Sequence, residues 1–245
     1  MSQSSHTVLI FGATGGVGAA LARRLATAGT PLFLTARREE PLAALAAELG
    51  AAYATSDATD WAEIDRVADL ARERFGSIGG VANCVGSLIL KPAHLTKFEE
   101  FQLTIAQNLT SAFGVVRAAA RVMPDGGAVV LCSTAASRIG LSNHEAIAAA
   151  KGGVNGLVLS AAATYASRGL RVNAVAPGLV ETPLTARITG SAPAVQASQA
   201  MHALGRIGQP DDVASLMAWL LGPDATWVTG QLYGVDGGLG TVRSK

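Results

Sequence analysis

The sequence of 245 residues contains little cysteine, few aromatic residues and few charged residues. Its two cysteines, Cys84 and Cys132, are too few for the disulfide scaffold of a secreted protein, so we expect a reducing, cytoplasmic setting. Charged residues make up only 15% of the chain, and 19 basic and 18 acidic side chains give a net charge of +1. A nucleic-acid-binding surface needs a basic excess, so nucleic acid is not an expected partner.

Long hydrophobic runs are also missing. The first apolar run, residues 8–11, is too short for a signal peptide, and no run approaches the roughly twenty residues of a membrane span. We therefore expect no membrane partner. Hydrophobic residues still form 49% of the chain, which suffices for a large core without disulfide or metal. The composition favours a single domain over residues 1–245 with no metal site.

Short apolar segments alternate with longer segments of helical composition. The expected buried strands are residues 8–11, 31–35, 52–55, 81–83, 129–132, 171–175 and 231–235. The expected helices are residues 17–28, 39–49, 61–75, 98–123 and 143–166. This alternation predicts an α/β fold, a doubly wound parallel sheet of about seven strands with helices on both faces. Residues 182–204 show no clear pattern and are expected to form a flap over a substrate.

A cluster of glycines follows the first expected strand and opens the first expected helix. The segment runs Gly12, Ala13, Thr14, Gly15, Gly16, Val17 and Gly18. Glycines let backbone approach a pyrophosphate closely, and the free N–H groups of a helix N-terminus attract that phosphate. The spacing differs from Gly-x-Gly-x-x-Gly, but its place between strand and helix predicts a dinucleotide site in a Rossmann fold.

The end of the second expected strand indicates which dinucleotide binds. A carboxylate there would bind the adenosine ribose of NAD, but the chain has Arg37 and Arg38. Guanidinium groups bind phosphate in a bidentate manner, so these arginines predict NADP(H), with Arg37 the favoured partner of the 2′-phosphate. The alternative is that both arginines belong to a solvated helix face.

With these residues, the chain resembles the classical short-chain dehydrogenase/reductase family over nearly its whole length, although the threonine usual before the first glycine is Phe11 here. Within the family it is most similar to the group that includes β-ketoacyl thioester reductases. The resemblance assigns further cofactor contacts to Asp57, Ala58, Asn83, Gly86, Pro177, Gly178, Val180 and Thr182. It identifies Asn108 with the asparagine of the family's catalytic tetrad, and it implies a homodimer or homotetramer.

The sequence departs from the family pattern at one catalytic position. In the family, a tyrosine four residues before a lysine exchanges a proton with the substrate, a serine orients the carbonyl, and the lysine binds the nicotinamide ribose. The matching lysine is Lys151, but four residues before it stands Ile147. The serine position falls on Thr134, which also carries a hydroxyl, with Ser133 just before it. An isoleucine has no proton to donate, so ordinary ketone reduction is expected to be impaired.

A histidine could replace the missing acid. Ser142 and Glu145 have the spacing of a capping box, which predicts that the helix begins at Ser142. His144 would then lie on the same helix face as Lys151, about 10 Å nearer the N-terminus. Histidine transfers protons near neutral pH. Some divergent enoyl reductases of this superfamily have a tyrosine at this spacing. The alternative is a histidine that only lines the pocket or caps a loop.

Two functions agree with these residues. The first is an NADP(H)-dependent oxidoreductase with an altered proton donor, acting on a small-molecule carbonyl, imine or activated alkene. The second is a catalytically impaired NADP(H)-binding protein with a sensing or assembly role. The apolar faces of the helices at 98–123 and 143–166 could form the interface of an oligomer.

Overall fold

The computed structural model describes residues 6–242, and within them the strands form one parallel sheet of seven strands in the order β3-β2-β1-β4-β5-β6-β7. The strands are β1 (Thr7–Phe11), β2 (Leu32–Ala36), β3 (Ala52–Thr55), β4 (Ile78–Asn83), β5 (Gly127–Cys132), β6 (Leu170–Pro177) and β7 (Leu232–Val235). This arrangement confirms the expected α/β fold class. The expected strand bounds differ from the observed ones by a few residues at most.

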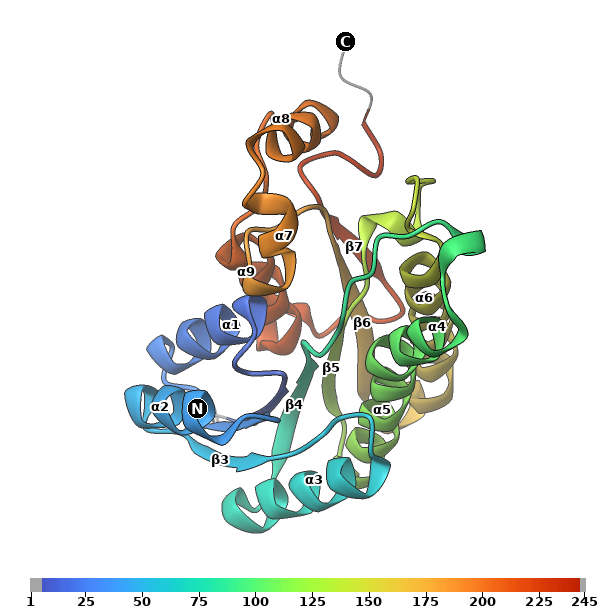
Figure 1. Cartoon of the computed structure of the whole chain (residues 1–245). Helices are drawn as coiled ribbons and strands as arrows, with labels where there is room; N and C mark the ends of the chain where they lie inside the picture. The colour runs from blue at the N-terminus through green and yellow to red at the C-terminus, as the bar shows by residue number, and fades with distance from the viewer. Residues whose placement is uncertain (1–5, 243–245) are drawn as a thin grey trace.

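Helices cover both faces of the sheet (Figure 1). The helices are α1 (Gly16–Thr27), α2 (Glu39–Leu49), α3 (Trp61–Phe75), α4 (Phe98–Ile105), α5 (Ser111–Val122), α6 (Glu145–Tyr165), α7 (Ala186–Thr189), α8 (Ala192–Met201) and α9 (Pro210–Leu221). Helices α3, α5 and α6 share one hydrophobic cluster with the sheet, and α1, α2 and α9 share the other. Helix α9 is not among the helices expected from the sequence, although Pro210 and two acidic residues in its first turn are typical of a helix start.

The strand β1 shows why the sheet is buried on both faces. Every one of its side chains is buried, and successive side chains point to opposite faces of a strand. Leu9 and Phe11 pack in the cluster of α3, α5 and α6, whereas Val8 and Ile10 pack in the cluster of α1, α2 and α9. A continuous apolar run is typical of a strand that is covered on both sides.

The expected helix at 98–123 is interrupted. Between α4 and α5, residues Ala106–Thr110 form a turn of π-helix, so the long helix carries a bulge near its middle. Asn108 lies inside this bulge and is buried. Single π turns within helices are frequent at functional sites because they re-aim a side chain.

The expected start of the helix at Ser142 is wrong. Helix α6 begins at Glu145, His144 occupies the capping position, and no side-chain cap forms. Asn143 adopts a left-handed conformation with φ 63°, and its carbonyl accepts a hydrogen bond from the backbone N–H of Lys91 at 2.8 Å. The Glu145 carboxylate accepts from the backbone N–H of Ala93 at 3.4 Å. This segment therefore bonds to the loop after β4 instead of extending the helix.

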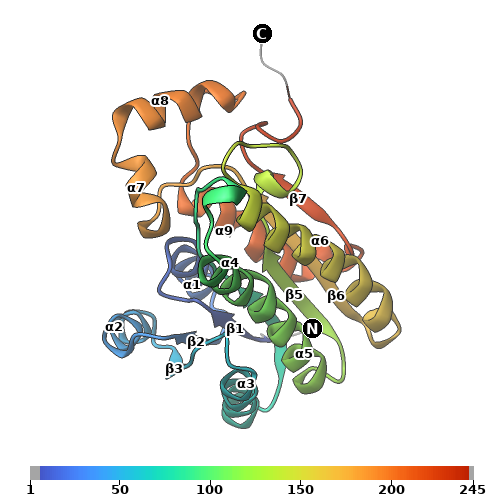
Figure 2. The same cartoon turned by 45° about the vertical axis from the view of Figure 1, so that its right-hand side comes forward.

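Among the described residues, one helical stretch, residues 145–168, is long and apolar enough to cross a membrane by length and composition. It lies against β6 and α5, and 44% of its most apolar window is buried within the fold. It also carries the buried ammonium group of Lys151. Figure 2 shows α6 running beside α5 along the sheet. These contacts are those of a core helix.

Candidate functional site

The predicted glycine turn joins β1 to α1. Gly12 has φ 75°, a conformation that side chains rarely adopt, and its carbonyl accepts a hydrogen bond from Gly15 N–H at 3.0 Å. A Cβ atom at Gly18 would lie 2.3 Å from that same carbonyl oxygen. A Cβ at Gly16 would lie 2.6 Å from the methyl group of Thr182. The turn therefore brings the N-terminus of α1 close to both β1 and the predicted flap.

A cavity of about 520 Å³ opens at the carboxyl ends of the strands beside this turn. It is lined by Phe11, Gly12, Thr14, Gly15, Thr35, Ala36, Arg37, Arg38, Ser56, Asp57, Ala58, Thr59, Cys84, Val85, Gly86, Gln107 and Pro183. The cavity brings together the glycine turn, the two arginines after β2 and the predicted adenine-side residues after β3. The predicted residues Gly16, Val17, Gly18, Asn83, Lys151, Pro177, Gly178, Val180 and Thr182 lie outside this lining.

The arginines and the aspartate lie at the ends of neighbouring strands β2 and β3. Arg37 and Arg38 are exposed at the mouth of the cavity. The Asp57 carboxylate accepts hydrogen bonds from the backbone N–H of Thr59 at 2.9 Å and from its hydroxyl at 2.8 Å. These bonds, with the nearby charge of Arg37, lower the pKa of Asp57. The strand ends therefore hold one fixed carboxylate beside two exposed cations.

Asn108 and Lys151 converge on Gly86. The Asn108 side chain donates to the carbonyl of Thr104 at 2.9 Å and accepts from Ser87 N–H at 3.3 Å. A Cβ atom at Gly86 would lie 2.9 Å from the Asn108 Oδ1 and 3.7 Å from the Lys151 Nζ. A side chain here would crowd the Asn108 amide, whereas 3.7 Å is an ordinary contact with Lys151. The π turn of Asn108 and helix α6 thus place both groups beside Gly86, which lines the cavity.

The Lys151 ammonium group is buried and is held by the end of β5. Its Nζ donates to the carbonyl oxygen of Cys132 at 2.7 Å. Burial lowers the pKa of Lys151, because removal from water disfavours the charged form. A buried lysine of this kind is costly, so its position indicates a use beyond packing.

The two hydroxyls after β5 have different surroundings. Ser133 is buried, and its hydroxyl lies 2.6 Å from the Asn155 Oδ1 and 3.1 Å from the Ser137 hydroxyl. Thr134 is half-buried and accepts from the backbone N–H of Ala136 at 3.3 Å. Ser133 therefore serves the contact between this loop and α6. Thr134 is the better candidate for contact with a substrate.

Ile147 and His144 lie at the start of α6. Ile147 is 4% exposed, so the position expected to hold a tyrosine is filled by a buried hydrocarbon. The His144 Nδ1 lies 2.8 Å from the carbonyl oxygen of Ser142. A carbonyl only accepts, so Nδ1 carries a proton and Nε2 is the nitrogen that could exchange one with a substrate. His144 stands just before the first residue of α6 and makes no side-chain cap, so its proposed role as a proton donor stays a prediction.

Comparison with known proteins identifies the family of this chain. Residues 12–240 match the sequence pattern of the family described as enoyl-(acyl carrier protein) reductase. The chain belongs to the short-chain dehydrogenase/reductase family. It is a member of a family of nucleotide-binding oxidoreductases.

Two curated relatives and one solved structure show the range of this family. The chain is 34% identical over 244 residues to 3β-hydroxysteroid dehydrogenase 1 of Eggerthella lenta, covering 95% of this chain and 93% of that protein. It is 31% identical over 239 residues to the cyclic-di-GMP-binding biofilm dispersal mediator protein of Escherichia coli, covering 97% and 98%. The structure of a variant of actinorhodin polyketide ketoreductase with NADPH matches with a TM-score of 0.92, at 30% identity, covering 98% of this chain and 99% of that one.

The predicted flap of this short-chain dehydrogenase/reductase holds helices α7 and α8. His202, at the end of α8, is buried, and its Nδ1 donates to the carbonyl of Ser198 at 2.6 Å. Its Nε2 accepts from the backbone N–H of Leu179 at 3.3 Å. This histidine ties the end of α8 to the segment that follows Pro177 and Gly178. Sequence reasoning missed it, because a lone histidine in an irregular segment gives no periodic signal.

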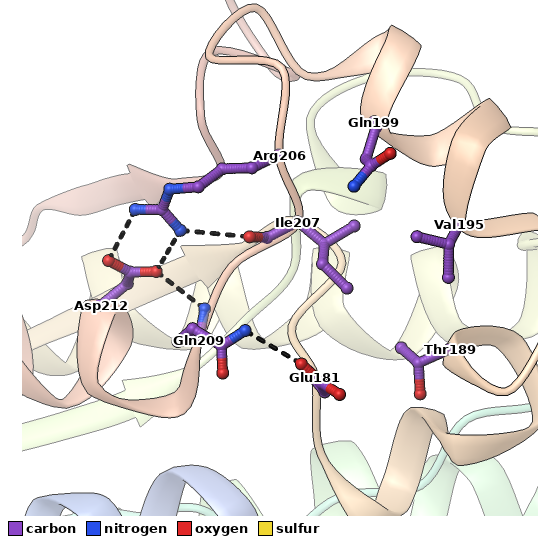
Figure 3. Close-up of a pocket in the computed structure, with 8 residues that line it drawn as sticks. All are labelled: Glu181, Thr189, Val195, Gln199, Arg206, Ile207, Gln209 and Asp212. Atoms are coloured by element: carbon purple, nitrogen blue, oxygen red, sulfur yellow. Dashed lines mark hydrogen bonds and ion pairs between the residues drawn. The ribbon is translucent and has the colours of Figure 1, made fainter. Parts of the chain in front are cut away.

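A second cavity, of about 480 Å³, lies between the flap and the start of α9 (Figure 3). Arg206 makes two hydrogen bonds to the Asp212 carboxylate, and Gln209 donates to Glu181 at 3.0 Å. The polar side chains on this wall bond to one another. They therefore anchor the chain that returns from the flap to the start of α9.

We expect substitution in the glycine turn to lower the stability of the folded protein. In Gly18→Ala the new methyl group would overlap the carbonyl of Gly12, so the free energy of unfolding should fall by about 2 kcal/mol. Gly152→Ala is the matched control, because a Cβ at Gly152 meets nothing within 4 Å. It should raise stability by roughly 0.5–1 kcal/mol. Urea unfolding compares the two variants, and equal effects would contradict the close packing of the turn.

Acid should weaken the ion pair between Arg206 and Asp212 at the start of α9. The hydrogen bond from Arg206, with one from the backbone of Gln209, lowers the pKa of Asp212 from 3.8 to about 2. The stabilisation is therefore complete above pH 4 and is lost as the pH falls towards 2. The carboxylate is 34% exposed, so solvent screening leaves a contribution of about 1 kcal/mol.

The corresponding measurement is urea unfolding between pH 2 and pH 6. The deficit of Asp212→Asn relative to the wild type should be largest at pH 6 and should shrink on acidification. Asp224→Asn, which removes an exposed carboxylate from a 3₁₀ turn, is the control. A deficit that does not vary with pH would show that the ion pair is not its source.

Proposed function

We propose that this protein is an NADP(H)-dependent oxidoreductase that transfers hydride to or from a small carbonyl, imine or activated alkene. The observation that carries the proposal is the cavity at the strand ends, which combines the glycine turn with Arg37 and Arg38. The chain has no carboxylate directly after β2 that would repel a 2′-phosphate. The NADPH in the related ketoreductase structure supports the same cofactor.

The residues present fit a dinucleotide. Gly16 and Gly18 let the turn pack tightly against Thr182 and the Gly12 carbonyl, and Gly12, Thr14 and Gly15 line the cavity where the N-terminus of α1 begins. Arg37 and Arg38 would bind the 2′-phosphate, Asp57 and Ala58 would contact the adenine, and Gly86 would let the ribose approach. Thr182 and the segment from Pro177 to Val180 would hold the nicotinamide end. When bound, the nicotinamide supplies or accepts the hydride.

The remaining chemistry would fall to residues at the end of β5, on α6 and in the π turn beside Gly86. The ammonium group of Lys151 would donate to a ribose hydroxyl, as the family resemblance implies, while the Cys132 carbonyl fixes its position. The Thr134 hydroxyl would donate to the substrate oxygen or nitrogen. Asn108 would keep the loop after β4 in place through its bonds to Ser87.

This chain differs from the family pattern in the group that would donate the proton. Ile147 can only exclude water, and the loss of a general acid costs roughly 10² to 10⁴ in rate. A substrate that needs less protonation, such as an imine or an activated alkene, would tolerate this loss. The His144 Nε2 would supply the proton, since Nδ1 is engaged by the carbonyl of Ser142.

A binding protein is the second candidate function. One relative, covered over 98% of its length, is named for binding cyclic-di-GMP and for mediating biofilm dispersal. A chain that keeps the cofactor cavity and lacks a proton donor at residue 147 would suit a sensing or assembly role. The two functions differ in turnover and not in cofactor binding.

We also propose that the protein forms a homodimer or homotetramer. Apolar side chains stand exposed along α4, α5 and α6, the helices expected to supply an interface. They include Phe98, Leu103, Phe113 and Leu159. Exposed apolar patches of this kind mark interaction surfaces. The cytoplasmic location stays a prediction.

Arg37 should determine the choice between the two nicotinamide cofactors. In Arg37→Ala the loss of a charge-assisted bond to phosphate, about 1.5–3 kcal/mol, should raise the Kd for NADPH by roughly tenfold to a hundredfold. The Kd for NADH should stay nearly constant. Arg72→Ala, which removes an exposed arginine from α3, is the control. Fluorescence titration measures both constants, and equal losses for both cofactors would contradict the assignment.

The activity test compares the wild type with Ile147→Tyr and Ile147→Phe. NADPH oxidation is followed with ketones, β-ketoacyl thioesters, enones and imines. We expect wild-type turnover with enones or imines, and ketone reduction about 10² faster in Ile147→Tyr than in the wild type. Ile147→Phe adds the same bulk without a hydroxyl and should not gain ketone reduction.

Substitution of His144 completes this test. His144→Gln should lower wild-type turnover by about 10² or more while the Kd for NADPH is unchanged. Turnover by Ile147→Tyr alone, with a silent wild type that still binds NADPH, would instead favour the binding protein.

A further inference from the structure

The two cysteines of the chain lie side by side beneath the cofactor cavity. Cys132 ends β5, and Cys84 directly follows β4. Asn83 pairs with Leu131 in the parallel ladder, so the next residues along the two strands, Cys84 and Cys132, are neighbours. Both side chains pack against the hydrophobic cluster of α1, α2 and α9, which places them on one face of the sheet. The Cys132 thiol lies 3.9 Å from the Met217 sulfur of α9, on that same face.

This spacing is close to that of a disulfide. Neighbouring strands of a sheet lie about 4.8 Å apart, and the Cα atoms of a disulfide are usually about 4.4–6.8 Å apart. The Cys84 backbone N–H donates to the Phe11 carbonyl at 2.9 Å and Cys132 pairs with Val175, so the two Cα atoms are held at neighbouring positions. The bond would form by rotation of the two side chains toward each other.

The groups around the two thiols favour the thiolate form of Cys132 over that of Cys84. The neighbouring Cys132 thiol and burial raise the pKa of Cys84, whereas the neighbouring Cys84 thiol and the charge of Lys151 lower the pKa of Cys132. The Lys151 ammonium group is fixed close by, since it donates to the Cys132 carbonyl at 2.7 Å. A cation beside a thiol favours the thiolate, which is the nucleophilic form.

The pair also contacts the elements that would hold the cofactor. Cys84 lines the cavity, and a Cβ at Gly12 would lie 2.9 Å from the Cys84 carbonyl carbon. Cys132 carries the carbonyl that positions Lys151. A bond that pulls Cys84 and Cys132 together would shift the floor of the cavity against the glycine turn.

We propose that Cys84 and Cys132 are a redox modification site, at which a hydroperoxide forms a reversible disulfide that weakens NADP(H) binding. The part of this inference that concerns NADP(H) rests on the proposed function. The formation of the disulfide depends only on the two thiols and their surroundings.

The chemistry needs only the two thiols and the peroxide. The Cys132 thiolate attacks one peroxide oxygen, so that an S–O bond forms, the O–O bond breaks, and the leaving oxygen takes a proton to become water or an alcohol. The Cys84 sulfur then attacks the sulfenic sulfur of Cys132 and gives up its proton. The S–S bond forms, the S–O bond breaks, and the hydroxyl group leaves as water. Two thiols are oxidised, one peroxide is reduced, and a dithiol reverses the change.

The test treats the reduced full-length protein with a small excess of hydrogen peroxide. We expect both free thiols to disappear, with a mass loss of about 2 Da in a chain that stays monomeric on a denaturing, non-reducing gel. The Kd for NADPH should rise about tenfold or more, and dithiothreitol should restore it. Saturating NADPH added before the peroxide should slow the loss of thiols.

Two variants identify the roles of the cysteines. Cys84→Ser should leave a sulfenic acid on Cys132 that a dimedone probe captures, whereas Cys132→Ser should keep its remaining thiol at the same peroxide dose. Each variant is compared with itself before and after peroxide, so any change in its initial NADPH affinity does not matter. Neither should acquire the dithiol-reversible loss of affinity seen in the wild type.

Several outcomes would overturn the proposal. These are free thiols that survive the treatment, a disulfide that links two chains, and a Kd for NADPH that does not change when the intrachain disulfide forms. A reduced protein that never binds NADPH would instead contradict the proposed function, and the thiol count and mass would still decide whether the disulfide forms.

Discussion

All seven strands described in residues 6–242 run in the same direction, so their carboxyl ends open on one edge of the sheet. The chain order reverses between β1 and β4, where the connections leave in opposite directions. Ligands of doubly wound sheets bind at such a reversal. The glycine turn, the arginines after β2 and the loop after β4 therefore meet in one cavity although they are far apart in the sequence.

Burial of the Lys151 ammonium group lowers the stability of the folded protein. Lys151 is 5% exposed and hydrogen-bonded to the carbonyl at the end of β5, and burial lowers its pKa. The family resemblance implies that this lysine binds the nicotinamide ribose, and that is the role proposed for Lys151. A buried cation without a use would cost stability, so its retention favours a cofactor site that still works.

Much of the fold and of the cofactor cavity could be predicted from the sequence. Apolar strands, helix-length segments and the glycine turn are local signals, and Arg37 and Arg38 follow a strand by simple adjacency. The start of α6 could not be predicted, because Asn143 and Glu145 bond to the loop around Lys91 and Ala93, which is distant in the sequence. The π turn around Asn108 also depends on packing against α6.

The roles of the sulfur and hydroxyl groups needed the three-dimensional structure as well. The sequence shows two cysteines 48 positions apart, and only the register of β4 and β5 makes them neighbours. Ser133 and Thr134 are adjacent in sequence, yet the hydroxyl of the first bonds to Asn155 of α6 and that of the second accepts from the backbone of its own loop, at Ala136. Periodicity and spacing do not report contacts of this kind.

The central claim is that a nicotinamide dinucleotide binds along the carboxyl ends of the central strands. Amide hydrogen exchange of the wild-type protein with and without NADPH tests this claim directly. Protection should rise together in the segments 12–18, 35–38, 56–59, 84–87 and 177–183. Protection confined to residues 189–212, around the cavity between the flap and α9, would contradict the account. So would an exchange pattern that saturating NADPH leaves unchanged.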